Sequence, residues 1–394
     1  MPGSEKLCFS MAATLEFQPS DAVASPAEPL VFRSIVRLEQ LDEIKDAWQE
    51  LGEQSRSPID QFHWTRCCLA TIARGEELRA AALVREGKLL AAAGLIATGT
   101  WIKRSVLIGV AQLREPADLL WSNEQALEML LKRLVQSGRP LVFERVPAIS
   151  ATPDLLEKVC RGRALFVCRP QPSCPFIPLD AHWREPENNL NSGRRSDLRR
   201  ARRRAEQIGP LTTEILAPRA GELDDLLDTA FAIEDRSWKG DAGTALVRDR
   251  QRAEFYRHYA HAAAADGTLR LCFLRIGAAP AAMQLAVERG GGFWLLKIGY
   301  DAQFRACSPG LLLMRDTIAY AASSGLATYE FLGEADQWTE VWTRQERRTV
   351  SLRVYPFGAR GMAALAADAV RMAGRSSREG LEKCKQRLRT WNHK

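Results

Sequence analysis

The sequence predicts an α/β (α+β) protein built from two similar modules, each a mixed, mostly antiparallel sheet flanked by helices. Three observations lead to this prediction. A chain of 394 residues is longer than one simple hydrophobic core accommodates. Short apolar runs typical of strands are interspersed with longer segments of helical spacing. The order hairpin, strand, helix, strand occurs twice, which indicates an internal duplication.

Composition shifts along the chain set the expected boundaries. Residues 1–29 are rich in Ala, Ser and Pro without periodicity, and we expect a disordered leader there. The N-terminal module is expected over 30–180, followed by a linker and basic helix over 181–210. The C-terminal module is expected over 211–358, with basic helices over 359–394.

In the N-terminal module, apolar residues at helical spacing predict a helix over Leu38–Leu51. A later helix has Ser122 and Gln125 at capping-box spacing and ends at Gly138. The strands expected there are Ala80–Val84, Leu89–Leu95, Trp101–Ile108 and one that begins at Leu141.

The C-terminal module repeats this order. Its expected helices are Leu223–Glu234, Arg250–Ala265 and Gly310–Ser324, and its expected strands are Leu269–Arg275, Ala281–Val287, Phe293–Ile298 and Thr328–Leu332. Because a hairpin is followed by strand, helix and strand, we expect a mixed sheet with helices on both faces.

Composition also excludes several classes of protein. Nine scattered cysteines without a CxxC pair indicate reduced thiols and a cytoplasmic location. The five histidines form no metal-binding motif, so we expect no metal. No apolar run reaches the roughly 18–20 residues that span a bilayer, so the chain is not expected to be transmembrane.

The net charge of +7 is concentrated in part in Arg194–Arg204. This block has three interpretations: a solvated helix face, a contact with an anionic partner or acyl-donor phosphate, or an RNA contact. Nucleic acid is the least favoured, because no aromatic residues are interleaved with the arginines.

One stretch indicates a phosphate site. A strand ends at Gly299, a short loop passes Arg305, and a helix begins at Ser308-Pro309-Gly310. Serine is a favoured N-cap and proline a favoured first helical residue. The free amides of a first helical turn attract phosphate, and Arg305 can add charge-assisted hydrogen bonds. The alternative is a capped helix start without a ligand.

Three stretches together carry a family resemblance. They are Glu234-Asp235-Arg236-Ser237-Trp238-Lys239-Gly240, Lys297–Asp301 with Ser308–Gly310, and Tyr329–Gly333 with Trp342. In this order the chain resembles GNAT acetyltransferases of the CelD/BcsL group, which have a BioF2-like acetyltransferase domain. The resemblance covers residues 190–357 well and extends weakly over the N-terminal half.

This resemblance implies two tandem GNAT-like modules, related in layout to FemAB-type transferases. It implies an acyl-CoA-dependent N-acyltransferase that uses acetyl-CoA, with an amine of a sugar or small metabolite as acceptor, and a link to exopolysaccharide or cellulose biosynthesis. Two alternatives remain open: an aminoacyl-tRNA-dependent FemAB-like transferase, and a non-catalytic partner protein in polysaccharide assembly.

The resemblance also assigns residues to roles. The cofactor-binding candidates are Ile298, Gly299, Arg305, Ser308, Pro309 and Gly310. The strand Phe293–Gly299 is expected to splay from Thr328–Leu332 and leave a slot for the pantetheine arm, and the candidate bases are Glu330, Asp301 and Glu234. The candidate acceptor contacts are Trp238, Lys239 and Trp338.

Two departures are visible in the sequence. Family members commonly carry a Tyr-Lys pair after the glycine that matches Gly333, whereas Gln337-Trp338-Thr339 occupies that region here. The first module lacks the phosphate loop and has the acidic stretch Leu113–Asp118 in its place, which would repel a pyrophosphate. We therefore expect the first module to bind no CoA and to serve as a scaffold or acceptor wall.

Overall fold

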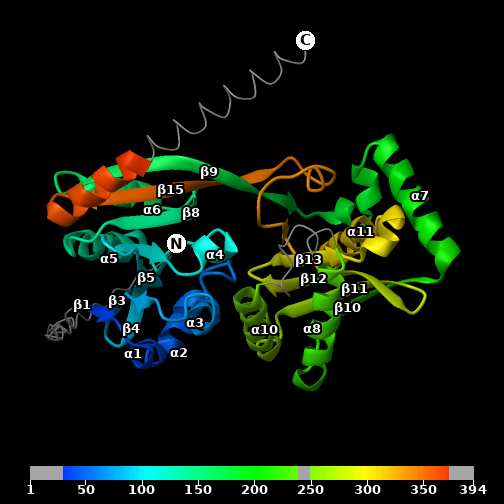
Figure 1. Cartoon of the computed structure of the whole chain (residues 1–394), viewed down its shortest axis with the longest axis horizontal. Helices are drawn as coiled ribbons and strands as arrows, with labels where there is room; N and C mark the ends of the chain where they lie inside the picture. Colours follow the sequence, from blue (N-terminus) through cyan, green and yellow to red (C-terminus); the bar gives the residue numbers. More distant parts are fainter. Residues whose placement is uncertain (1–29, 238–248, 372–394) are drawn as a thin grey trace, which may run out of the picture.

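In the described part of the computed structural model, strands form one mixed 11-stranded sheet and one antiparallel 4-stranded sheet, with helices packed on their faces (Figure 1). The structure describes residues 30–237 and 249–371. The strand order is β1-β3-β4-β7 in the small sheet and β10-β11-β12-β13-β14-β9-β15-β8-β6-β5-β2 in the large one. The predicted α/β class with helix-flanked mixed sheets is therefore confirmed.

The N-terminal module contains six helices and nine strands in the described part of the chain. They are β1 (Val31–Ile35), α1 (Leu38–Asp42), α2 (Lys45–Gly52), α3 (Phe62–Ala70), β2 (Glu77–Leu78), β3 (Ala80–Arg85), β4 (Lys88–Ala93), β5 (Leu95–Thr98), β6 (Arg104–Leu107), α4 (Val110–Leu113), β7 (Leu120–Trp121), α5 (Glu124–Gln136), β8 (Leu141–Pro147), α6 (Thr152–Cys160) and β9 (Ala164–Pro178).

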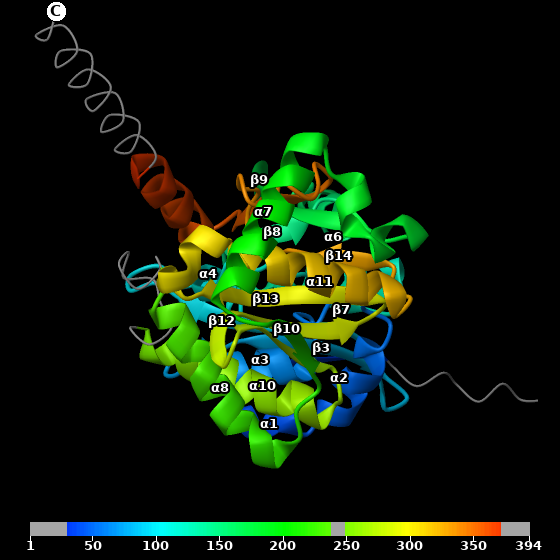
Figure 2. The same ribbon diagram turned by 90° about the vertical axis from the view of Figure 1, so that its right-hand side faces the viewer.

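The rest of the described chain begins with two short 3₁₀ turns, η1 (Ala181–Arg184) and η2 (Pro186–Asn189). The later elements are α7 (Ser192–Ile208), β10 (Leu211–Leu216), α8 (Ala220–Asp235), α10 (Arg250–Ala265), β11 (Leu269–Ile276), β12 (Ala279–Arg289), β13 (Gly292–Tyr300), η4 (Ala302–Cys307), α11 (Pro309–Ser323), β14 (Thr328–Glu330) and β15 (Glu346–Pro356). Helices α7 and α11 cover one face of the C-terminal sheet, and α8 and α10 cover the other (Figure 2).

Both modules repeat one topology. In the C-terminal module β10, β11, β12 and β13 pair antiparallel in order, and β13 then pairs parallel with β14. In the N-terminal module β1, β3 and β4 pair antiparallel in the same way, and β6 pairs parallel with β8. Gly94 separates β4 from β5. The strand that corresponds to β12 is therefore divided here into two strands, one in each sheet.

Two long strands join the modules. The start of β9 pairs with β15, whereas its end, Phe176–Pro178, pairs with β14 of the C-terminal module. Strand β15, which we did not predict and whose residues we assigned to the C-terminal module, returns to the N-terminal module and pairs with β8. Each module therefore completes its sheet with a strand from the other half of the chain.

The hydrophobic core also crosses this boundary. Trp64 on α3 contacts the rings of Phe255 and Tyr259 on α10, with centroids 4.9 and 4.8 Å apart. All three side chains are buried and belong to one cluster that includes residues of both modules. Burial of large aromatic side chains is among the strongest contributions to a core, so the two halves are held together by packing.

Some predicted elements differ in detail. The helix expected over Leu38–Leu51 is divided into α1 and α2, because Ile44 leaves the helical conformation while its side chain joins the core. Helix α5 begins after Asn123, whose side chain accepts from the Ala126 amide, so our assignment of Ser122 as the cap was wrong. The Gly138 stop is confirmed by its left-handed φ of 70°.

The tail begins as a helix over 359–371 that docks on the N-terminal module. Asp368 is buried there and accepts hydrogen bonds from Arg104 and Tyr355, while Ala364 is fully buried. The described part of this basic tail is therefore docked on the protein. Among the described helices, none combines the length and apolar character needed to cross a membrane.

Candidate active site

Strands β13 and β14 diverge at the centre of the C-terminal sheet. Their parallel pairing ends at Trp294 and Glu330, while β13 continues to Tyr300 and pairs with β12 on its other side. A bulge between Leu285 and Ala286 of that second pairing bends the strand. Beyond Glu330 the chain turns away, and the Phe331 amide donates to the Pro175 carbonyl on β9. The sequence-predicted splay is thus present.

The splay opens into a cleft of about 880 Å³. Its walls come from β12, the end of β13, the start of α11 and the loop that follows β14. The predicted cofactor-binding residues all line it: Ile298, Gly299, Arg305, Ser308, Pro309 and Gly310. Most of the remaining wall is apolar, including Met314, Leu332 and Trp342. A largely apolar cleft with Arg305 and the start of a helix in its wall suits a thioester-bearing arm that ends in phosphates.

The polar end of the cleft is the junction of η4 and α11. Arg305 is exposed, and its guanidinium forms no hydrogen bond or ion pair with the described residues. Ser308 has a left-handed φ of 47°, and its carbonyl accepts from the Leu311 and Leu312 amides. Ser308 is the N-cap of α11, as predicted, but its side chain makes no capping hydrogen bond. Within the described chain the Gly310 amide has no acceptor, so it is open to a ligand.

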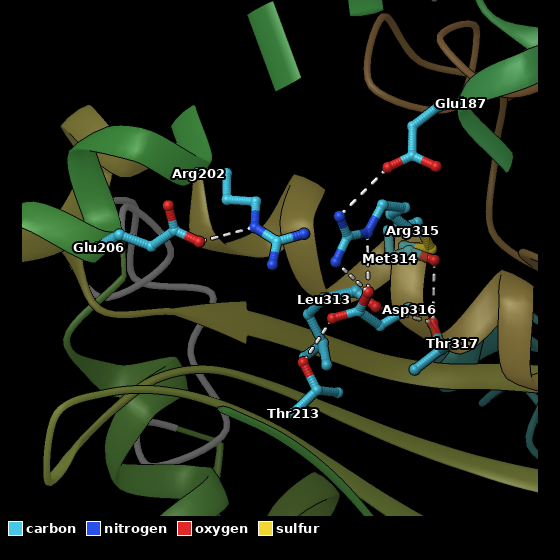
Figure 3. A network of polar contacts seen from close by, with 9 residues as sticks. All are labelled: Glu187, Arg202, Glu206, Thr213, Leu313, Met314, Arg315, Asp316 and Thr317. Carbon is cyan, nitrogen blue, oxygen red and sulfur yellow. Dashed lines mark hydrogen bonds and ion pairs between the residues drawn. The ribbon is translucent and has the colours of Figure 1, made fainter. Parts of the chain in front are cut away.

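A polar network fixes α11 in place (Figure 3). Arg315 donates to Glu187 on η2 at 3.2 Å and also to its neighbour Asp316. The other oxygen of Asp316 accepts from the Thr213 hydroxyl on β10. Two elements, η2 and β10, are therefore joined to the helix whose first turn lines the cleft, which pre-organises that turn before a ligand arrives.

Helix α7 lies against the same loop. Its buried side is formed by Leu198, Ala201 and Ala205, and Arg204 donates to the Ala306 carbonyl at 3.0 Å. Arg200 and Arg202 pair with acids on α7 itself. The side chains of four further arginines make no hydrogen bond or ion pair with any described residue: Arg194, Arg195, Arg199 and Arg203. The predicted basic helix is present, and uncompensated positive charge borders the cleft.

The three candidate bases lie outside the cleft lining. Glu330 is 2% exposed, and Arg347 binds both of its carboxylate oxygens at 2.6–3.1 Å. Asp301 is 3% exposed and accepts from Arg236 and from the Gln303 amide. Glu234 is fully buried, 3.8 Å from Lys297 Nζ. Engaged carboxylates of this kind stabilise the fold, and the geometry does not favour these three residues as bases.

Gly299 permits a close approach between β13 and α8. A Cβ at this position would stand 2.9 Å from Glu234 Cα, which is closer than real Cβ contacts. At Gly310 a Cβ would meet Tyr300 at 3.7 Å, an ordinary contact. Gly299 is therefore required by packing, whereas Gly310 leaves room at the cleft.

Of the predicted acceptor contacts, Trp338 lines the cleft and packs edge-on against Phe331, with centroids 5.7 Å apart. Trp238 and Lys239 lie outside the described residues. The loop Gly333–Trp338 forms one wall of the cleft.

Our sequence reasoning missed residues of the N-terminal module that hold this loop. Arg145 is 3% exposed, adopts a left-handed φ of 55°, and donates to the Gly333 carbonyl at 2.6 Å. Arg114 pairs with Glu334 at 2.6 Å, and the Gly333 amide donates to Glu115 at 3.5 Å. Leu332 and Gly333 both have positive φ, near 56°. Residues with strained backbone conformations of this kind are concentrated at functional sites.

The chain matches one known domain family. Residues 192–340 match the family described as "Acetyltransferase (GNAT) domain", which covers the splayed strands, the loop and the cleft. The C-terminal part of the chain is accordingly similar to the acyltransferase domains of the GNAT type. No curated protein matches the chain.

Solved structures resemble nearly the whole chain. FemX has 13% identity and a TM-score of 0.52, covering 83% of this chain and 97% of its own. The C-terminal domain of a putative lysylphosphatidylglycerol synthetase from Agrobacterium fabrum has 10% identity and a TM-score of 0.51, covering 84% and 97%. A conserved protein of unknown function from Bacteroides thetaiotaomicron has 11% identity and a TM-score of 0.53, covering 83% and 99%. Similarity at these identities establishes a shared fold.

Proposed function

We propose that this chain transfers an acyl group, acetyl by preference, from a CoA thioester to an amine. The observation that supports the proposal best is the divergence of β13 from β14 at the cleft that Arg305 and the first turn of α11 border. The apolar slot suits the pantetheine arm, and the Gly310 amide and Arg305 suit the diphosphate. An amine held in the slot attacks the thioester carbonyl directly, without a covalent enzyme intermediate.

The proposed acceptor is an amine on a sugar or small metabolite, in line with the resemblance to the CelD/BcsL group and its link to exopolysaccharide. The exposed Trp338 at the cleft supports this acceptor class, because aromatic faces pack against sugars. Reduced cysteines favour a cytoplasmic location, where acyl-CoA is available.

Isothermal titration calorimetry with acetyl-CoA tests the proposal. Arg305→Glu replaces attraction to the diphosphate by repulsion, so binding should weaken at least about tenfold, which corresponds to about 1.4 kcal/mol. Arg85→Glu is the matched control, since Arg85 is an exposed arginine on β3, away from the cleft, and this change alters the net charge equally. Equal affinity in the wild type and Arg305→Glu would remove the phosphate-loop assignment.

A second candidate donor is an aminoacyl ester on tRNA. The observation that favours it is the row of arginines without partners on α7 beside the cleft. A gel shift with tRNA tests this donor, with the wild type compared with the double variant Arg199→Glu and Arg203→Glu. The assay is run at low salt, because contacts with phosphates are strongest at low salt. Absence of a shift in the wild type would exclude this donor.

A further inference from the structure

A carboxyl group from the N-terminal module stands beside the wall of the cleft. Glu115 follows α4, and this helix lies on the side of its module that faces the C-terminal sheet (Figure 1). It is 7% exposed, and its Oε2 accepts from the amide of Gly333, a residue that lines the cleft. Its other oxygen, Oε1, has no hydrogen bond or ion pair to any described residue. One carboxylate oxygen is therefore available beside the cleft.

Charged and titratable groups surround this carboxyl from several elements. They are Arg145 on β8, Cys174 on β9, Arg252 and Tyr256 on α10, and Lys297 on β13. Burial is the largest influence and raises the pKa of Glu115 to about 7, while the Gly333 amide and the three cations oppose it. A group that titrates near neutral pH is suited to take up and release a proton in each turnover.

The three carboxyls predicted from the sequence do not combine an oxygen that has no partner among the described residues with a pKa raised toward neutrality. Glu330 is bound through both oxygens by Arg347, and Asp301 is held by Arg236 and its own turn. Glu115, in contrast, belongs to the acidic stretch that departs from the phosphate loop in the first module. Glu115 does not itself line the cleft of the second module, but its hydrogen bond with Gly333 places it against the loop that forms one wall of that cleft.

Building on the proposed acyl transfer, we propose that Glu115 is the proton acceptor for the attacking amine, and that the amine binds where the two modules meet. The amine nitrogen forms a bond to the thioester carbonyl carbon, and its proton passes to Glu115 Oε1. The carbon–sulfur bond then breaks, and the leaving thiolate takes a proton, which restores the carboxylate. The products are the amide and free CoA thiol, so atoms and charge balance.

Calorimetry with acetyl-CoA near pH 7, in two buffers of different ionisation enthalpy, measures the protons taken up on binding. The acyl end should remove water from Glu115 and favour its protonated form, so the wild type should take up part of a proton. Glu115→Gln keeps an acceptor for the Gly333 amide. This variant should still bind acetyl-CoA, but without the proton uptake that Glu115 contributes. Glu340→Gln, an exposed carboxyl in the same loop and outside the cleft lining, should behave as the wild type.

Equal proton uptake in the wild type and Glu115→Gln would overturn this inference and leave acetyl-CoA binding intact. Failure of the wild type to bind acetyl-CoA would instead overturn the proposed function, and this inference with it. For any amine that the wild type acetylates, Glu115→Gln should lower kcat by about 10²–10⁴-fold with the KM for acetyl-CoA unchanged. Unaltered turnover would likewise contradict the assignment.

Discussion

At the scale of single residues, Ser308 shows how the loop obtains its shape. A side chain at a left-handed φ of 47° costs roughly 1–2 kcal/mol relative to glycine. Glycine also loses more entropy on folding, about 0.4–1 kcal/mol. We therefore expect Ser308→Gly to leave the free energy of unfolding unchanged or to raise it by about 1 kcal/mol.

Urea denaturation measures this effect, and Ser308→Ala, which keeps the strained conformation without the hydroxyl, is the control. Since the Ser308 hydroxyl makes no cap, alanine should match the wild type. Glycine should retain acetyl-CoA binding because the backbone contacts of the turn are unchanged. A clear loss of stability with glycine would show that the turn does not need this φ.

Asp60 makes stability depend on pH. It is buried, and burial together with the neighbouring carboxylate of Asp118 raises its pKa to about 7. Because the folded-state pKa exceeds the unfolded value, the stabilisation is complete below about pH 4 and is lost as pH rises through 7. At about 1.4 kcal/mol per pKa unit, the loss approaches 4 kcal/mol.

Asp60→Asn should remove this dependence, since an amide does not ionise and still accepts from the Ser55 hydroxyl. Urea denaturation of both proteins from pH 5 to pH 8 measures it. As pH rises, the free energy of unfolding should fall more in the wild type than in Asp60→Asn. The titration of Glu115 contributes equally to the pH dependence of both proteins. Parallel profiles would show that Asp60 does not titrate in this range.

The candidate site was predictable from the sequence to the extent that its residues are neighbours in the chain. Gly299, Arg305 and Gly310 surround one turn, so their spacing sufficed to place them at the cleft. Glu115 was missed because its position depends on how one module faces the other. The signal in the sequence was the acidic stretch that contains it, which we interpreted by its repulsion of phosphate alone.

At the scale of elements, the contact of β13 with α8 depends on Gly299. A Cβ there would stand 2.9 Å from Glu234 Cα, so Gly299→Ala should shift the helix and destabilise the fold by about 1–3 kcal/mol. Gly310→Ala places its methyl in ordinary contact with Tyr300 and should be neutral or stabilising by up to about 1 kcal/mol. Thermal unfolding of the pair checks this, and equal losses would contradict it.

Elements defined by local pattern were predictable, and elements defined by distant partners were not. Periodicity predicted α8, α10 and α11, which bury one stripe each. The partners of β9 and β15 were missed, because pairing between strands some 180 residues apart leaves no local pattern. The break between α1 and α2 was missed for the same reason, since packing of Ile44 determines it.

At the scale of the whole molecule, exchange of β9 and β15 makes the two modules one folding unit. Without the N-terminal half, β14 loses β9, and β15 loses both β8 and β9. The rings of Phe255 and Tyr259 would also lose Trp64 and become exposed. Truncation therefore removes sheet pairing and core packing together.

We accordingly expect the fragment 181–394 to lack cooperative unfolding on its own, and to regain it when fragment 1–180 is added. For the intact chain, tryptophan fluorescence and far-UV circular dichroism should give coincident urea transitions, as expected of one cooperative unit. Exposed ion pairs between the halves, such as Arg74 with Glu254, contribute little, and the buried pair of Arg104 with Asp368 is shielded from solvent ions, so salt should shift the midpoint only slightly. Independent folding of fragment 181–394, with stability near that of the whole chain, would show that the strand exchange is dispensable.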